Sequence, residues 1–289
     1  MENQRQFKGG LLPTPRDSRD FKIKKLFGAV DTSKFPSNYM VGKPIKIKDQ
    51  GDTDFCAAFA TCAVSELQEG LELNPLWQFA KIKQLEGDWE GWGADLRMAC
   101  KSAVKMGSLP ETLAPFHLGE RSRDYLANWT NWDSNLDLSA LYHCKKTYWR
   151  VEDGFEGFRT ALYLNKAAIL TGVIWCNEWT YAEGGVIDKA GTKTEGHALA
   201  AIGWRTIGSK LFLVVQNSYS DEVGDKGLYY FSKELVNKLF VYGGFAFVDL
   251  SPEEAKQVAW SAQTKIIEKI KSILMSISDA FKQLFNQKL

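Results

Sequence analysis

The sequence predicts a fold of the α+β class, in which a helical half precedes a half built from strands. Apolar residues recur at helical spacing in the part from about residue 50 to 135. In the part from 136 to 250, short apolar or alternating runs are separated by glycine-bearing turns. Hydrophobic residues make up 45% and charged residues 25% of the 289 residues, which is ordinary globular usage. We therefore expect two lobes with a cleft between them, where ligand sites tend to lie.

Residues 1–34 are polar and basic, and they predict an extended strap ahead of the two lobes. The run 'LLPTPRDSRD' at 11–20 carries two prolines and has no usable periodicity. Residues 1–10 lack the apolar stretch of a secretory signal, and no window reaches the roughly 18 consecutive apolar residues of a membrane span. We therefore expect a cytoplasmic protein.

Charge and cysteine content argue against several classes of function. The net charge of +1 gives no overall field for phosphate backbones, so we expect no nucleic acid partner. The five cysteines have scattered spacings and no C-x-x-C pair, which argues against a disulfide framework. The three histidines are far apart in the sequence, and we expect neither a metal site nor a cofactor.

The helical half contains three clear helix signals. The run 'CAAFATCAVSELQEG' predicts a core helix that begins at or near Cys56 and ends at Gly70. Further helices are predicted over Pro75 to Leu85 and over Ala94 to Met106, the second closed by Gly107.

The second half predicts a sheet of about five strands. Each run is short, apolar or alternating, and bounded by glycine-bearing turns. The runs are Ala167 to Trp175, His197 to Trp204, Lys210 to Asn217, Gly227 to Ser232 and Gly243 to Leu250.

The tail, residues 251–289, predicts a long amphipathic helix. Ser251 and Pro252 provide an N-cap and a proline at the first helical position, and two acidic residues follow in the first turn. Such a helix packs on its own domain, self-associates, or contacts a partner or a membrane surface. The sequence leaves these alternatives open.

Cys56 is the first candidate for chemistry because of its position. A cysteine at a helix N-terminus is near the positive end of the helix dipole and near free backbone N–H groups, which favour the thiolate. The alternative is that it is a small buried hydrophobe, as we expect for Cys62 inside the same helix.

A nucleophilic thiol needs a base and an orienting group. His197 opens one predicted strand and Asn217 closes the next, so an antiparallel hairpin would make them neighbours. Gln50 precedes Cys56 by six residues, close enough for its side-chain amide to converge with the Cys56 backbone N–H on a developing oxyanion. Taken singly, the histidine is more often structural, and Gln-Gly and Asn-Ser are ordinary turns.

These segments resemble papain-like cysteine peptidases. 'QGDTDFCAAFA' is similar to the active-site segment, 'GHALAAIGW' to the histidine strand and 'QNSYSDEVGDKGLYYF' to the Asn-Ser-Trp block. 'FPSNYM' and 'GWGADLRMACKSAVKMGSLPETLAPF' resemble the mature start and the cleft wall. His197 and Asn217 lie 141 and 161 residues after Cys56, against about 130 to 150 in the family. The resemblance spans about residues 11 to 250.

The resemblance implies a papain-like two-lobed peptidase domain over 35–250. It implies that Cys56 and His197 form a thiolate–imidazolium pair, that Asn217 holds the imidazole through its Nδ1 hydrogen, and that Gln50 binds the oxyanion. The chain would then be a cysteine endopeptidase acting on protein or peptide substrates through an acyl-enzyme.

Residues that would bind the substrate are also implied. Gly91 to Gly93 are expected to pair with an extended peptide by their backbone. Trp92 walls an apolar subsite or packs in the core. Gly196 lies beside the histidine, and Tyr219 replaces the tryptophan that shields the His–Asn hydrogen bond.

Departures from the family keep two alternatives open. Asp54 and Phe55 replace a small Gly-Ser pair and Ala57 replaces the usual tryptophan, which favours a catalytically weak binding or assembly module. The same thiol chemistry also suits an amidase or transpeptidase acting on cell-wall peptides. The strap is too short for the family's helical inhibitory propeptide, is similar to N-terminal segments of intracellular bacterial and phage members, and, like the tail, is a candidate for restraining the enzyme.

Overall fold

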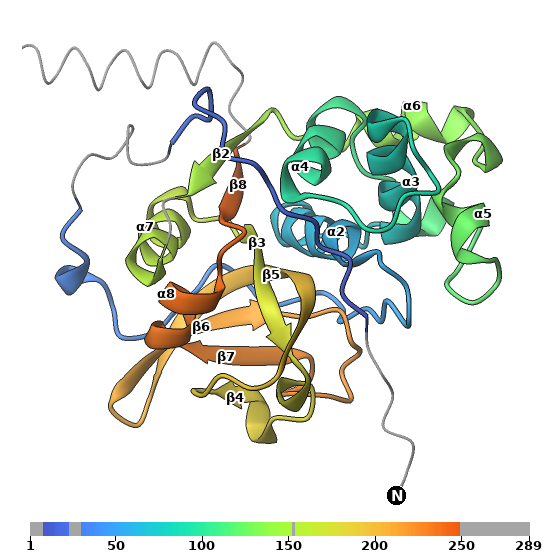
Figure 1. Cartoon of the computed structure of the whole chain (residues 1–289). Helices are drawn as coiled ribbons and strands as arrows, with labels where there is room; N and C mark the ends of the chain where they lie inside the picture. Colours follow the sequence, from blue (N-terminus) through green and yellow to red (C-terminus); the bar gives the residue numbers. More distant parts are fainter. Residues whose placement is uncertain (1–7, 23–29, 152–153, 249–289) are drawn as a thin grey trace, which may run out of the picture. The chain divides into compact units, whose positions relative to one another are not determined.

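The computed structural model of the protein describes residues 8–22, 30–151 and 154–248 (Figure 1). The amphipathic helix expected over 251–289 lies outside the described residues. The α-helices are α2 (Cys56–Glu69), α3 (Pro75–Glu86), α4 (Leu96–Lys105), α5 (Arg123–Ala127), α6 (Asn135–Leu141), α7 (Phe155–Asn165) and α8 (Lys233–Leu239). Short 3-10 turns are η1 (Thr32–Lys34), η2 (Glu111–Leu113), η3 (Trp129–Asn131), η4 (Asn177–Trp179) and η5 (Glu183–Gly185).

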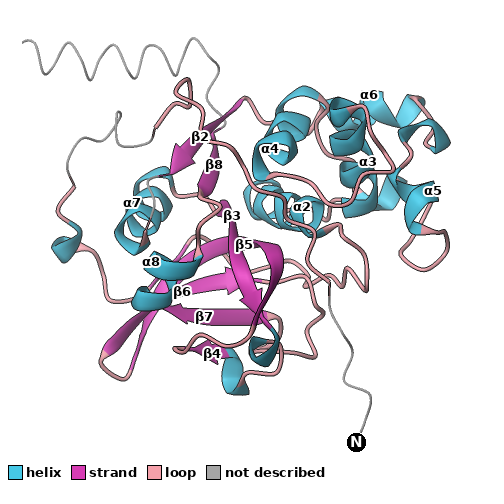
Figure 2. Ribbon diagram, in the orientation of Figure 1, coloured by secondary structure: helices cyan, strands magenta, loops and turns pink. Residues whose placement is uncertain are grey.

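The three predicted helices are confirmed, with ends set by local capping. Helix α2 begins at Cys56 and ends at Gly70, whose φ of 73° lets its N–H reach the Glu66 carbonyl. Asn74 caps α3 through a 2.8 Å bond to the Trp77 N–H, and Asp95 caps α4 in the same way. Figure 2 shows these helices gathered on one side and the strands on the other.

The strands form one sheet with the order β2-β8-β3-β5-β6-β7-β4, and β1 pairs with β5. Each described neighbouring pair is antiparallel except β4 with β7. The five predicted strands correspond to β3, β5, β6, β7 and β8. The strands are β1 (Tyr39–Met40), β2 (Thr147–Val151), β3 (Ile169–Cys176), β4 (Val186–Ile187), β5 (Lys193–Ile207), β6 (Lys210–Gln216), β7 (Leu228–Ser232) and β8 (Gly244–Val248).

Helix α2 joins the two halves of the fold. It contacts both α3 and β5, and its first eleven residues are buried. Buried alanines on α2 and on β5, such as Ala57 and Ala198, belong to the same core cluster, and their small side chains allow a close approach of helix and strand. The first residue of α2 therefore lies beside the middle of β5. The predicted α+β class with two lobes is confirmed.

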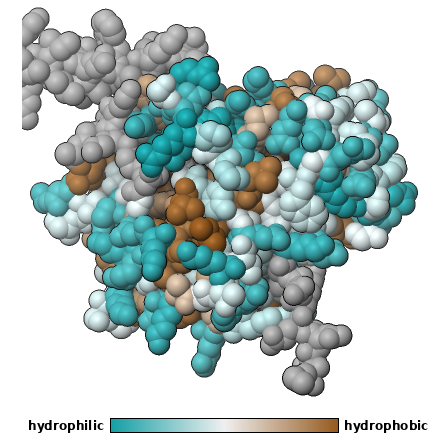
Figure 3. Space-filling model, in the orientation of Figure 1, coloured by the Kyte–Doolittle hydropathy of each residue, from teal (hydrophilic) through white to brown (hydrophobic). Residues whose placement is uncertain are grey.

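Figure 3 shows one face of the molecule, on which a hydrophobic group lies near the centre and smaller hydrophobic groups lie among hydrophilic residues elsewhere. None of the helices in the described ranges is long and apolar enough to cross a membrane.

Candidate active site

Cys56 occupies the first position of α2, where the helix dipole favours a thiolate. Its side chain is nevertheless completely buried. Burial raises the pKa of Cys56 to about 12, although the backbone N–H groups of Ala198 and Gly10 donate to the sulfur and oppose this shift. The nucleophile candidate is therefore a neutral thiol in this state.

The strands β5 and β6 place His197 beside Asn217. Their antiparallel register pairs Ala200 with Gln216, which confirms the predicted neighbourhood of the two side chains. The His197 Nε2 lies 2.7 Å from Asn217 Oδ1, and the Ser218 N–H donates to the same oxygen at 2.7 Å. The expectation that Nδ1 makes this bond is wrong, because Nδ1 faces a different group. His197 also lies inside β5, four residues after its start, and not at its beginning.

Tyr219 is the residue that faces Nδ1 of His197. Its hydroxyl lies 3.1 Å from that nitrogen, and the two rings stack with centroids 4.5 Å apart. Burial lowers the pKa of His197 to about 4, while its hydrogen bond to Asn217 opposes the shift. Within the described residues no hydrogen bond joins the Cys56 thiol to the imidazole, and the shifted pKa values of both groups favour their neutral forms.

Gln50 is completely buried, and both its Oε1 and its Nε2 make hydrogen bonds. Its Oε1 accepts from the Ser218 hydroxyl at 2.6 Å, which fixes the orientation of the amide. Its Nε2 donates to the carbonyl oxygens of Thr53 at 2.8 Å and Lys8 at 3.1 Å. The donor expected to bind an oxyanion therefore binds a carbonyl group of the strap.

Residues 10–12 of the strap bond to both the sheet and the helical half, and this part of the chain runs between them in Figure 1. On the side of β5, the Leu11 N–H donates to the Gly196 carbonyl at 3.0 Å. On the opposite side, the Ala94 N–H donates to the Gly10 carbonyl at 2.9 Å, and the Leu12 N–H donates to the Ala94 carbonyl at 3.0 Å. The backbone of residues 10–12 thus satisfies polar groups on both walls, and the Leu11 side chain is buried.

Glycines on both sides permit this close approach. A Cβ on Gly10 would overlap the Asp54 backbone, and a Cβ on Gly93 would overlap the Gly10 carbonyl group. Gly93 also has a φ of 67°, which favours glycine. Contact between the strap and the cleft wall therefore requires glycine at positions 10 and 93.

The expected substrate-binding glycines have another use in this structure. The Gly91 carbonyl accepts from Arg123 Nη2 at 2.6 Å, and the Gly93 N–H donates to the Asp54 carboxylate. The backbone that pairs with an extended segment belongs to the next residue, Ala94. Trp92 is 47% exposed, so it does not pack in the core, and Lys8 Nζ lies 5.6 Å from its ring centroid.

The two bulky residues before Cys56 are accommodated by the helical half. Phe55 is buried and stacks on Phe79 with centroids 4.0 Å apart. Asp54 is buried and bound by Arg123 through Nε at 3.1 Å and Nη2 at 2.8 Å. The extra charge that the sequence places here is therefore compensated.

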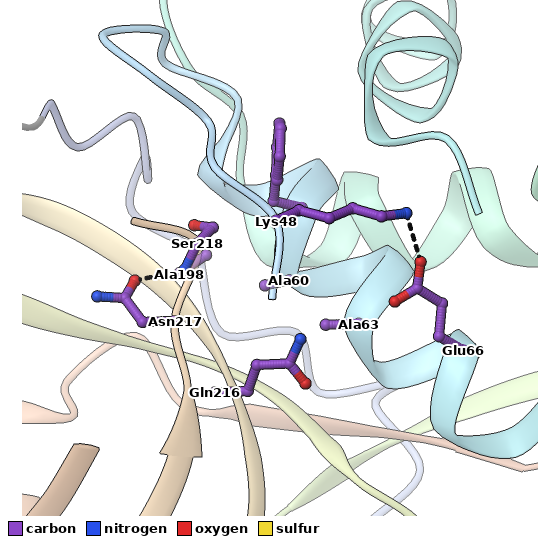
Figure 4. A pocket seen from close by; sticks show the side chains of 9 residues that line it. Lys48, Ala60, Ala63, Glu66, Ala198, Gln216, Asn217 and Ser218 are labelled. Carbon is purple, nitrogen blue, oxygen red and sulfur yellow. Dashed lines mark hydrogen bonds and ion pairs between the residues drawn. The ribbon is translucent and has the colours of Figure 1, made fainter. Parts of the chain in front are cut away.

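A small cavity lies behind the site, next to Asn217 (Figure 4). Its volume of about 10 Å³ holds about one water molecule, and no substrate. Figure 4 shows the ion pair of Lys48 with Glu66, at 2.6 Å, beside this cavity.

Sequence analysis did not identify the contribution of Ala94, Arg123 or Lys8 to the site. The glycine pair at 9–10 within an otherwise polar segment was the available signal for the strap. Nothing near Arg123 indicates its partner, which lies 69 residues away. The five cysteines are free, and no group of three metal-ligating side chains occurs in the part of the chain that the structure describes.

A family model described as papain family cysteine protease matches residues 35–241. A search of curated protein sequences finds no match.

Solved structures of cysteine proteases share this fold. The chain is similar to xylellain, a cysteine protease from Xylella fastidiosa, with a TM-score of 0.71 and 18% identity over 86% of this chain and 99% of that one. It is similar to procathepsin B S9 from Trypanosoma congolense, with a TM-score of 0.60 and 16% identity over 82% of each chain. It is also similar to the bromelain protease from Ananas comosus, with a TM-score of 0.55 and 16% identity over 73% of this chain and 98% of that one.

Proposed function

Because the chain belongs to the papain family of cysteine proteases, we propose that it is an endopeptidase in which Cys56 is the nucleophile and His197 the base. It is a hydrolase of the cysteine peptidase class. The observation that supports these roles best is the position of Cys56 at the start of α2, where its sulfur contacts the Ala198 N–H. Ala198 directly follows His197, the histidine that Asn217 holds.

The proposed reaction begins with proton transfer from the Cys56 thiol to Nδ1 of His197. The thiolate attacks the peptide carbonyl, and the developing oxyanion accepts a hydrogen bond from Gln50 Nε2. His197 then gives its proton to the leaving amine, and a thioester remains on Cys56. Water, deprotonated by the same ring, attacks the thioester, and its proton returns to the thiol.

We propose that the state described here is latent because of the strap. Residues 8–12 occupy the cleft and bury Cys56, whose pKa is raised to about 12, while the pKa of His197 is lowered to about 4. With these values the imidazole does not take the thiol proton. Removing the strap would admit water, which lowers the thiol pKa and raises the imidazole pKa. The thiolate–imidazolium pair then becomes accessible.

The proposed substrates are protein segments in an extended conformation. The backbone groups of Ala94 and Gly196 that bind the strap are the groups that would bind such a segment. The five free thiols agree with the expected reducing, cytoplasmic location.

A second candidate is a binding module with a papain-like fold. It is favoured by the missing hydrogen bond between Cys56 and His197, both of which the structure describes. In that case residues 8–12 would mimic a bound ligand, and their displacement would not produce an active enzyme.

The experiment uses the full chain with Leu11→Asp. This variant places a charge where the Leu11 side chain is buried, which should displace the strap. Leu12→Asp is the matched control, since that side chain is 40% exposed. We expect only the first variant to hydrolyse a fluorogenic peptide library, and its Cys56 to react with iodoacetamide at lower pH than Cys62 of the same helix. Adding His197→Ala should abolish both properties. Rapid strap release without any hydrolysis would favour the binding module.

A further inference from the structure

The hydroxyl group of Tyr219 makes a contact that shielding of the histidine does not require. Its ring stacks on His197, and Trp175 packs edge-on against both rings at 5.2 and 5.5 Å. A phenylalanine at this position would give the same cover. The Tyr219 Oη in addition lies 3.1 Å from His197 Nδ1, the nitrogen that must accept the thiol proton.

The hydrogen bonds around the ring define its tautomer. Asn217 Oδ1 accepts from the Ser218 N–H, so it is an oxygen and can only accept from His197 Nε2. The proton of the neutral ring is therefore on Nε2, and Nδ1 carries the lone pair. The Tyr219 O–H donates to that lone pair, which stabilises the neutral ring.

We propose that Tyr219 is a positioning residue whose hydroxyl holds Nδ1 of His197 and withholds it from Cys56 until the site is opened. The inference rests on the proposed roles of Cys56 and His197. The hydroxyl must turn away, or become an acceptor, before Nδ1 can take the thiol proton. The base is thus restrained by a side chain of the enzyme itself, separately from the strap.

Few other titratable groups face this pair. Cys56 on α2 lies near enough to Tyr219 to affect its ionisation, as do Tyr229 on β7 and Glu195 on β5. Asn217 and Trp175, which also contact the ring, are uncharged. A change in the titration of His197 after removal of the Tyr219 hydroxyl would therefore report on that hydroxyl.

The test is nitrogen NMR of the full chain labelled with ¹⁵N-histidine, comparing the native protein with Tyr219→Phe from about pH 3.5 to about pH 8. The chain has only three histidines, and His197→Gln identifies the resonances of interest. We expect an Nε2–H tautomer that titrates near pH 4 in the native protein. In Tyr219→Phe we expect the midpoint to rise by about one pH unit, since a donor to the neutral form is lost.

Tyr230→Phe is the control, because it removes a hydroxyl that bonds Asp225 in the turn before β7, away from His197. It should leave the His197 midpoint unchanged. His143, which pairs with Glu69, reports on folding in the same spectra, and Tyr219→Trp provides a second variant without the hydroxyl. An unchanged midpoint in both Tyr219 variants, or an Nδ1–H tautomer in the native protein, would overturn the inference.

Activity separates this inference from the proposed function. In the Leu11→Asp chain, Tyr219→Phe should move the acid limb of kcat/KM to lower pH, because the freed Nδ1 pairs with the thiolate more readily. Absence of hydrolysis in Leu11→Asp itself would instead contradict the proposed function, whatever the NMR midpoints show.

Discussion

The carbonyl oxygen of Lys8 lies 3.1 Å from Nε2 of Gln50. The strap thus presents a peptide carbonyl to the donor that the family resemblance assigns to the oxyanion. Its neighbours bind both walls of the cleft through Gly196 and Ala94. The same segment places the Gly10 N–H beside the Cys56 sulfur, which is completely buried.

Replacing Gly10 by alanine should release the strap. The added Cβ overlaps the Asp54 backbone, which cannot move without shifting the start of α2. We expect cleavage by trypsin after Lys8 to become at least about tenfold faster, since cleavage follows the population of the open form. Leu12→Ala, at a side chain that is 40% exposed, should retain the native rate. Equal protection of Gly10→Ala and the native chain would show that the strap is not held as described.

Replacing Gln50 by alanine in the Leu11→Asp chain should lower kcat with little change in KM. Loss of one oxyanion donor typically costs about 10² to 10³ in kcat. Ser218→Ala keeps that donor and loses only the 2.6 Å bond that orients it, so its loss of activity should be smaller. The measurement is steady-state peptide hydrolysis. Similar kcat values in the two variants would contradict the role of Nε2.

The stability of the protein should fall in acid because of His197. Its pKa in the native state is lowered from 6.5 to about 4, so between these values the unfolded chain binds a proton that the native chain does not. The stability is fully present above about pH 6.5 and is lost as the pH falls through about 4, by about 2 to 4 kcal/mol in total. Urea unfolding at a series of pH values measures this slope, and His197→Gln should flatten it. The same slope in both proteins would contradict the lowered pKa.

Breaking the buried ion pair of Asp54 with Arg123, close to Cys56 in the sequence, should be strongly destabilising. Arg123→Met leaves the Asp54 carboxylate buried without its cation and should lower the free energy of unfolding by about 3 kcal/mol. Asp54→Asn combined with Arg123→Met should recover part of the loss, because no unpaired charge remains. The exposed pair of Arg19 with Asp17 is the control, and Arg19→Met should leave urea unfolding unchanged. A double variant no more stable than Arg123→Met would argue against the pairing.

Periodicity and capping signals in the sequence predicted most of the fold. The start of α2 at Cys56 and the hairpin of β5 with β6 followed from local patterns, and these elements position the candidate nucleophile and base. The strands β1, β2 and β4 and the helices α5 to α8 were missed. The strands β1 and β4 contain two residues each, too few to show alternation. The sequence also underestimated β5, which begins in the exposed run Lys193 to Glu195.

The parts of the site that sequence analysis missed depend on tertiary contacts. Ala94 binds the strap by backbone atoms, which leave no trace in residue type. Arg123 reaches Asp54 across 69 residues. His197 Nε2 bonds Asn217, and Nδ1 faces the Tyr219 hydroxyl. The second contact was missed because a comparison of residue types treats Tyr219 simply as a replacement of one aromatic by another.

The strap and the cleft it fills belong to one chain, and this determines how occupancy responds to concentration. An intramolecular segment acts at an effective concentration of the order of millimolar, whatever the amount of protein. Dilution therefore cannot empty the cleft, and a free peptide has to exceed that concentration or bind more tightly to displace residues 8–12. Under the proposed function, each molecule accordingly carries one stoichiometric competitor of its own substrates.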